Sequence, residues 1–89
     1  MVYFTLMKSK GPNRKDPLER DKRIKKIAER VRVLRKAKGS MDTFAYESGI
    51  PRSQVWRVEN GEEITLTTLL RIIDALGVPL SEFFDKDLD

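Results

Sequence analysis

Cysteine and histidine are both absent from this chain of 89 residues. Their absence excludes disulfide bonds, thiol nucleophiles, imidazole acid–base catalysis and the usual zinc sites. No apolar run approaches the roughly 20 residues of a membrane-spanning helix, and the opening MVYFTLM lacks the basic segment and small-residue cleavage site of a signal peptide. We therefore expect a soluble, cytoplasmic protein without metal, cofactor, membrane contact or small-molecule ligand, and without enzyme activity.

Acidic residues are scarce in the first part of the chain. Residues 1–38 hold 14 Lys or Arg against 4 Asp or Glu, a net charge of +10, whereas residues 39–89 hold 4 against 10, a net charge of −6. A basic block of this kind favours a polyanionic partner, nucleic acid before membrane. A basic helix face exposed to solvent explains the charge equally well.

Strand signals are confined to the first residues. VYFTL is β-prone, but the chain offers no second strand with which it could pair. Lys8–Lys15 has the composition of a linker. We divide the chain into an arm with linker (1–15), a helical domain (16–84) and an acidic tail (85–89). Two arms that pair across a dimer, a leader without structure, and a true start at Met7 are the alternatives for the arm.

Hydrophobic spacing and capping residues predict five helices between residues 16 and 84, which makes the fold all-α. For the first helix, Asp16 as N-cap, Pro17 at the first helical position and Glu19 three residues after the cap predict the start, and Gly39 predicts the end. Its apolar residues recur every three or four positions in one stripe that needs a buried partner: Ile24, Ile27, Ala28, Val31 and Leu34.

Two short helices are predicted next. Ser40 is the expected N-cap of a helix from Met41 to about Glu47. Gly49 then turns the chain into a third helix, which ends at Gly61.

A stronger apolar repeat marks the fourth helix. Thr65 is its expected N-cap, and it spans residues 66–76 before Gly77. Residues 79–84 read as a last short helical turn. The repeat of the fourth helix consists of Leu66, Leu69, Leu70, Ile73 and Leu76.

The runs IAERVRVLRKAKG, DTFAYESGIPRSQVWRVENG and TLTTLLRIIDALGVPLSEFF resemble the phage repressor and Cro-like, or Xre-type, helix-turn-helix family. The resemblance covers Ile24–Phe84 and implies a five-helix lambda-repressor-like DNA-binding domain that acts as a dimer. The restriction-modification controller proteins look most similar. The resemblance also implies a structural ion pair between Arg35 and Glu59. It rests on the order and spacing of Ala45 and Gly49, Val55 and Val58, Glu59-Asn60-Gly61, Ala75-Leu76-Gly77-Val78 and Ser81-Glu82-Phe83-Phe84.

Helical geometry gathers the polar side chains of the third helix on one side. At about 100° per residue, Val55 and Val58 share the inner side, whereas Ser53, Arg57 and Asn60 fall roughly 140° to 200° from Val55 and Trp56 falls near 100°. Arginine reads guanine, asparagine reads adenine, and an aromatic edge contacts a thymine methyl. For Arg57 a solvated surface is the alternative, and for Trp56 packing in a core or a dimer is equally favoured. The candidate base-reading residues are Arg52, Ser53, Gln54, Trp56, Arg57 and Asn60.

Phosphate contacts and dimer contacts are predicted elsewhere. Lys22 and Lys26 of the first helix, with Thr67 and Thr68 at the amino end of the fourth, are the candidate phosphate-binding residues. The expected partners are double-stranded DNA and a second copy of the chain. A role in the monomer core is the alternative for Leu80 and Phe83. The expected dimer interface consists of Ile72, Leu80, Phe83 and Phe84.

Three positions depart from the family pattern. Met41 replaces a glutamine that bonds a phosphate, the loop after Gly39 is one residue short, and Glu62 and Glu63 follow the third helix where they would repel phosphate. We expect a sequence-specific, homodimeric transcription regulator of repressor or controller type. The alternative is an antitoxin-like or scaffold interaction module that has lost DNA binding.

Overall fold

The structure, a computed structural model, describes residues 21–88. Over that range the chain forms five α-helices, one 3-10 helix and no strand, so the prediction of an all-α, five-helix domain is confirmed. The arm, with its predicted strand, and the linker lie outside the described residues. The elements are α3 (Lys22–Lys38), α4 (Met41–Ser48), α5 (Arg52–Glu59), α6 (Leu66–Leu76), α7 (Leu80–Phe83) and η1 (Lys86–Leu88).

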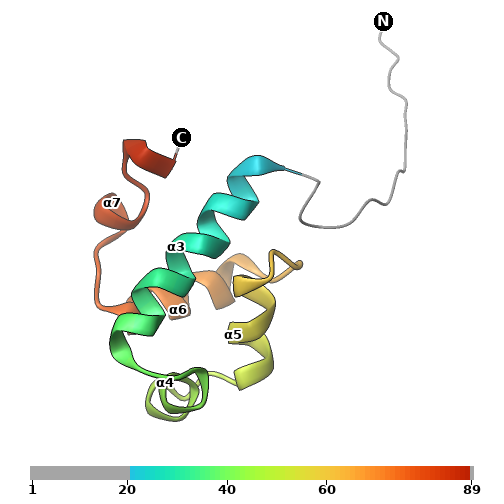
Figure 1. Cartoon of the computed structure of the whole chain (residues 1–89), viewed down its shortest axis with the longest axis vertical. Helices are drawn as coiled ribbons and strands as arrows, with labels where there is room; N and C mark the ends of the chain where they lie inside the picture. The colour runs from blue at the N-terminus through green and yellow to red at the C-terminus, as the bar shows by residue number, and fades with distance from the viewer. Residues whose placement is uncertain (1–20, 89) are drawn as a thin grey trace, which may run out of the picture.

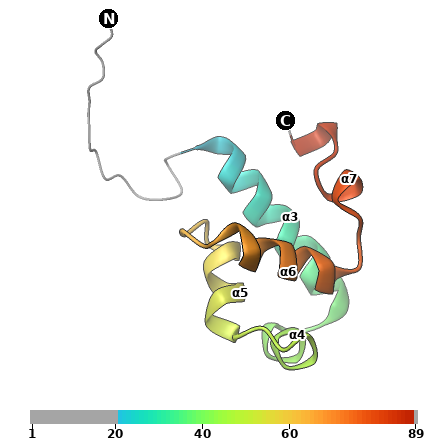
Figure 2. The ribbon, with the colours of Figure 1, turned by 180° about the vertical axis from the view of Figure 1, so that it is seen from behind.

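Helix α3 organises the domain. It crosses the molecule with α5 along one flank and α7 with η1 along the other (Figure 1). In the view from behind, α6 passes across α3 between α5 and α7 (Figure 2). The core where these helices meet contains Val31, Phe44, Ile50, Val55, Val58, Ile72, Ile73, Leu76 and Phe83.

The amino end of α3 differs from the prediction. Asp21 has an extended backbone and is the N-cap, because its carboxylate accepts a hydrogen bond of 2.8 Å from the backbone N–H of Arg23. The helix therefore begins at Lys22, and the predicted start at Asp16 and Pro17 is wrong for this helix. Those two residues lie outside the described range.

The other predicted caps are present. The Ser40 hydroxyl accepts from the N–H of Thr43, and the Thr65 hydroxyl accepts from the N–H of Thr68, each at 3.1 Å. Gly49 has a φ of 73°, a left-handed conformation that glycine adopts without a steric cost. The chain can therefore turn sharply there from α4 into α5.

The buried side of α6 is only partly the one predicted, since Leu69, Ile73 and Leu76 face the core as expected but Leu66 and Leu70 do not. Ile72 and Ile73 are buried, whereas Leu66 is 70% exposed and Leu70 is 41% exposed. Leu69, Ile72, Ile73 and Leu76 also follow a three-and-four spacing, so this leucine-rich helix carries two overlapping apolar stripes. Packing against α3 and α5 selects one stripe and leaves the other at the surface.

The acidic segment that follows α7 is hydrogen-bonded to α3. Arg30 Nη1 donates to the carbonyl of Phe83 at 2.7 Å and to Asp85 Oδ1 at 2.9 Å. This hydrogen bond lowers the pKa of Asp85 below its ordinary value. Leu88 packs against the core. The segment predicted as an acidic tail is thus part of the folded domain as far as Leu88.

Candidate nucleic-acid interface

Helix α5 is held by one side and exposed on the other. Val55, Val58 and Glu59 are buried. Gly49 and Pro51 bring the chain into the helix, and Pro51 supplies no side-chain cap. The outward side carries two arginines, a hydroxyl and an indole that is 43% exposed, namely Arg52, Arg57, Ser53 and Trp56.

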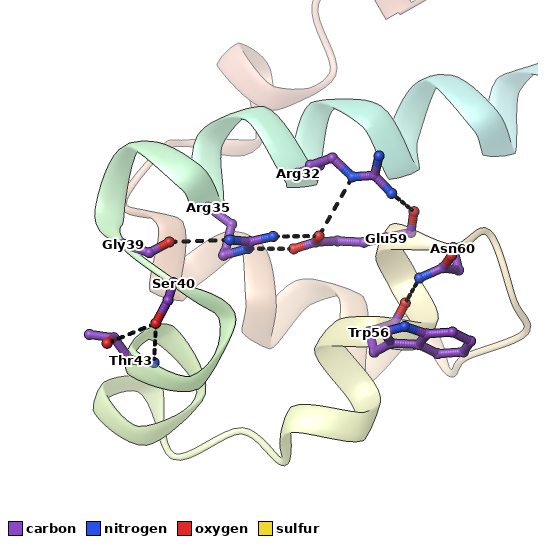
Figure 3. A network of polar contacts seen from close by, with 8 residues as sticks. All are labelled: Arg32, Arg35, Gly39, Ser40, Thr43, Trp56, Glu59 and Asn60. Atoms are coloured by element: carbon purple, nitrogen blue, oxygen red, sulfur yellow. Dashed lines mark hydrogen bonds and ion pairs between the residues drawn. The ribbon is translucent and has the colours of Figure 1, made fainter.

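A buried ion pair fixes α5 against α3. Arg35 donates from Nε to Glu59 Oε2 at 2.7 Å and from Nη2 to Glu59 Oε1 at 2.8 Å (Figure 3). These hydrogen bonds raise the pKa of Arg35 above its ordinary value, against the opposing effect of its burial. The ion pair expected from the family resemblance is therefore present.

Further contacts extend this network, and one of them is an ion pair in which Arg32 Nε lies 3.7 Å from Glu59 Oε1 (Figure 3). Arg35 Nη1 donates to the carbonyl of Gly39, and Arg32 Nη2 donates to the carbonyl of Glu59 at 3.3 Å (Figure 3). The carbonyl of Glu59 lies at the carboxyl end of α5, where backbone acceptors lack partners within the helix. Helix α3 thus holds both the buried face and the end of α5.

Both exposed arginines of α5 lie beside carboxylates from outside the helix. Arg52 Nε donates to Asp42 Oδ1 of α4, and Arg57 Nε lies 3.8 Å from Glu62 Oε1 in the following loop. The side chain of Arg52 is 59% exposed. Both guanidinium groups are accessible from outside.

Two polar residues of the predicted set face inward in part. Asn60 Nδ2 donates to the carbonyl of Trp56 at 2.8 Å, which satisfies an acceptor at the end of α5 (Figure 3). Gln54 is half-buried, and its Oε1 atom has no hydrogen-bond partner among the described residues. Asn60 therefore has a structural contact of its own, while Gln54 retains an unused acceptor.

An open hollow connects α5 to the amino end of α6. It has a volume of about 480 Å³. Thr65 caps α6 at this point, and the Thr68 hydroxyl accepts a hydrogen bond from Thr65 Oγ1. The first backbone N–H groups of a helix attract an anion. The residues that line the hollow are Gln54, Arg57, Glu63, Ile64, Thr65 and Thr68.

Comparison with known proteins decides what this arrangement is. The family model described as Helix-turn-helix matches residues 29–83, more than half of the chain. The chain belongs to this helix-turn-helix family. Its members are DNA-binding regulators of the Xre and lambda-repressor-like type. No curated protein and no solved structure matches the chain.

Within this helix-turn-helix domain, α4 and α5 are the two helices of the motif and α5 is the candidate recognition helix. Of the predicted base-reading residues, the structure places Arg52, Ser53, Trp56 and Arg57 on the exposed side. Gln54, also predicted to read bases, and Thr68, predicted to bind phosphate, line the hollow together with Arg57. Thr67 is exposed in the first turn of α6.

The two predicted lysines lie apart from that surface. Lys22 and Lys26 are exposed at the start of α3. At about 100° per residue they point away from Ile24, which lines a hollow together with the loop between α5 and α6. The structure therefore does not bring them together with the polar side of α5.

The predicted dimer residues separate into two groups. Ile72 is 0% exposed and Phe83 is 1% exposed, so both belong to the monomer core. The assignment of Ile72 to a dimer surface is wrong, and for Phe83 the alternative of a core role holds. Leu80 is 51% exposed. Phe84 is exposed on a different side of α7, where its ring meets that of Phe83 edge to face with centroids 4.9 Å apart.

Two features of this region were missed by sequence reasoning. Asp42 was not singled out, although its carboxylate in the first turn of α4 accepts a hydrogen bond from Arg52 in the first turn of α5. Met41 packs against the core instead of leaving a gap where the family has glutamine. In the described part of the chain no group of acidic residues could hold a metal ion, and no helix could cross a membrane.

Proposed function

We propose that the chain is a sequence-specific, homodimeric transcription regulator whose α5 enters the major groove of DNA. The observation that carries the proposal is the exposed row of Arg52, Ser53, Trp56 and Arg57 on a helix whose other side is locked into the core. A rigid helix with projecting donors meets the requirement of direct base readout.

The chemistry of the row suits base edges. The planar guanidinium of an arginine forms paired hydrogen bonds with guanine O6 and N7. The indole of Trp56 offers an apolar edge for a thymine methyl group, and the Ser53 hydroxyl can donate or accept. Arg52 and Ser53 lie at the amino end of α5, the end that approaches the bases in this motif.

Phosphate contacts follow from the neighbouring elements. The amino end of α6, with the Thr67 hydroxyl, lies beside the hollow that Arg57 lines and suits a phosphate of the same duplex. Lys22 and Lys26 contribute positive charge at a greater distance. Because phosphate contacts dominate affinity, binding is expected to weaken with added salt.

Dimerisation is assigned to the leucine stripe that α6 leaves exposed. Leu66 and Leu70 are one turn apart, and Leu70 and Leu80 line a shared hollow of about 510 Å³. A second copy would cover this apolar surface through a twofold axis. Two α5 helices would then face half-sites about one helical turn apart.

Selection from a library of random duplexes tests this proposal. The purified wild-type chain is expected to enrich a motif made of two related half-sites centred about 10 base pairs apart. Enrichment of no motif, at low salt as well, would contradict a DNA-reading function.

A second function has one observation in its favour. Asp42 and Glu62 lower the net positive charge around α5 and could make that face a surface for a protein partner. An interaction module of this kind, antitoxin-like or scaffold, would enrich no motif in the same selection. The repressor or controller role is proposed from the family resemblance alone.

A further inference from the structure

The geometry points to Asp42 as a positioning residue that sets the base preference of Arg52. This inference rests on the proposed function and names a determinant of specificity on α4, outside the recognition helix. In the protein without DNA, the carboxylate of Asp42 already favours one orientation of the Arg52 guanidinium.

The atoms used in the contact carry the argument. Arg52 donates to Asp42 through Nε. Among the described residues no hydrogen bond engages Nη1 or Nη2 of Arg52. A guanidinium offers five N–H groups in a flat fork, and paired recognition of guanine O6 and N7 needs only two parallel donors. Asp42 therefore occupies one edge of the fork and leaves donors for a base.

Stability does not account for the pair. The side chains of Arg52 and Asp42 are both well exposed, at 59% and 79%. An exposed ion pair contributes only about 0 to 1 kcal/mol to folding. A carboxylate near the DNA face also repels phosphate, which lowers affinity for any duplex. The contact also restricts what Arg52 can bind, because it occupies Nε of the guanidinium.

Competition with phosphate explains that restriction. A long arginine side chain at the edge of a groove can reach a phosphate oxygen as well as a base, and phosphates take most protein–DNA hydrogen bonds. Asp42 is anchored in the first turn of α4 and holds Arg52 by a charge-assisted hydrogen bond. Its negative charge also opposes a phosphate at the same position. Asp42 thereby favours a base edge over a phosphate oxygen as the partner of Arg52.

The second arginine of α5 shows the contrast. Arg57 Nε lies 3.8 Å from Glu62 Oε1, beyond hydrogen-bond distance, and Glu62 belongs to a loop. Glu62 therefore constrains Arg57 less than Asp42 constrains Arg52. We expect the loss of Asp42, and not the loss of Glu62, to change base preference sharply.

Parallel selections from random duplexes test the inference with wild type, Asp42→Ala and Glu47→Ala. Glu47 is an exposed carboxylate on the same helix, about 140° around the axis from Asp42. Its replacement by alanine therefore removes the same charge from α4 but leaves the contact with Arg52 in place. Asp42→Ala is expected to bind random DNA at least as tightly as wild type and to lose about twofold to fivefold of its discrimination at one guanine, which is the most that an exposed pair of up to about 1 kcal/mol can supply. That loss is a part of the roughly 5- to 150-fold that a paired arginine contributes. Glu47→Ala is expected to keep the wild-type preference.

Combination with Arg52→Ala decides whether Asp42 acts through Arg52. In the Arg52→Ala background, Asp42→Ala is expected to change discrimination no further. Asp42→Asn, which retains an oxygen acceptor for Arg52 Nε, is expected to restore part of the preference. An Asp42→Ala motif identical to that of wild type overturns this inference alone, whereas a wild-type chain that enriches no motif overturns the proposed function and the inference with it. Circular dichroism of each variant verifies that the domain is folded.

Discussion

Arg35 and Glu59 face each other across the interior and are joined by two hydrogen bonds of 2.7 and 2.8 Å. Arg35 belongs to α3, the longest of the described helices, and Glu59 to the candidate recognition helix, so the pair fixes the orientation of α5 against the core. Both residues are buried. Loss of Glu59 would leave the guanidinium of Arg35 in the core without a carboxylate, with the carbonyl of Gly39 as its remaining hydrogen-bond acceptor.

Replacement of Glu59 by alanine is therefore expected to destabilise the domain by about 3 to 5 kcal/mol. Urea denaturation followed by circular dichroism measures the change. An apolar double replacement, Arg35→Met with Glu59→Leu, is expected to recover most of the stability because no buried charge remains. A loss below about 1 kcal/mol for Glu59→Ala, the range of an exposed pair, would refute this role.

The sequence predicted the helices that have local stop and start signals. Ser40, Gly49, Thr65 and Gly77 bound α4 and α6 as expected, because caps act within one turn. The predicted start of α3 was wrong because Asp21, and not Asp16, is the N-cap of the described helix.

Tertiary packing decided what local patterns could not. In α6 both apolar stripes satisfy the helical spacing, and only contacts with α3 and α5 show that Ile72 is buried while Leu66 and Leu70 are not. For the candidate interface, the exposed row on α5 followed from helical geometry. The contact between Asp42 and Arg52 joins two helices, so the periodicity of either one could not reveal it.

The exposed leucines lead to a prediction about assembly. Leu70→Asp with Leu80→Asp is expected to convert a dimer to a monomer in sedimentation experiments, because charges would face each other across the twofold interface. Helicity should be retained, since both side chains are largely outside the core. Val33→Asp, at an exposed position on α3, is the matched control and should remain dimeric. A dimeric, folded double variant would place the interface elsewhere.

Asp21 makes the stability of the domain depend on pH in the acidic range. Hydrogen bonds from the side chain of Arg23, followed by its backbone N–H, lower the pKa of Asp21 to about 2. The folded state binds a proton on the Asp21 carboxylate less tightly than the unfolded state does. The contribution of this carboxylate to the stability of the fold is therefore complete above its unfolded pKa near 4, and it is lost as the pH falls toward 2. Arg23→Ala is expected to raise the pKa of Asp21 toward its ordinary value. Carboxyl chemical shifts in an NMR titration measure it, and an unchanged pKa would exclude Arg23 as the main cause.

The central claim is that the exposed side of α5 reads base pairs, and Arg57→Ala tests it most directly. Titration by fluorescence anisotropy compares wild type, Arg57→Ala and Lys22→Ala on the duplex selected by wild type and on a scrambled duplex of the same length. Arg57→Ala is expected to lose about 1 to 3 kcal/mol on the selected duplex and much less on the scrambled one, while Lys22→Ala, which removes a more distant positive charge, weakens both slightly and alike. Equal losses of Arg57→Ala on the two duplexes would contradict the claim.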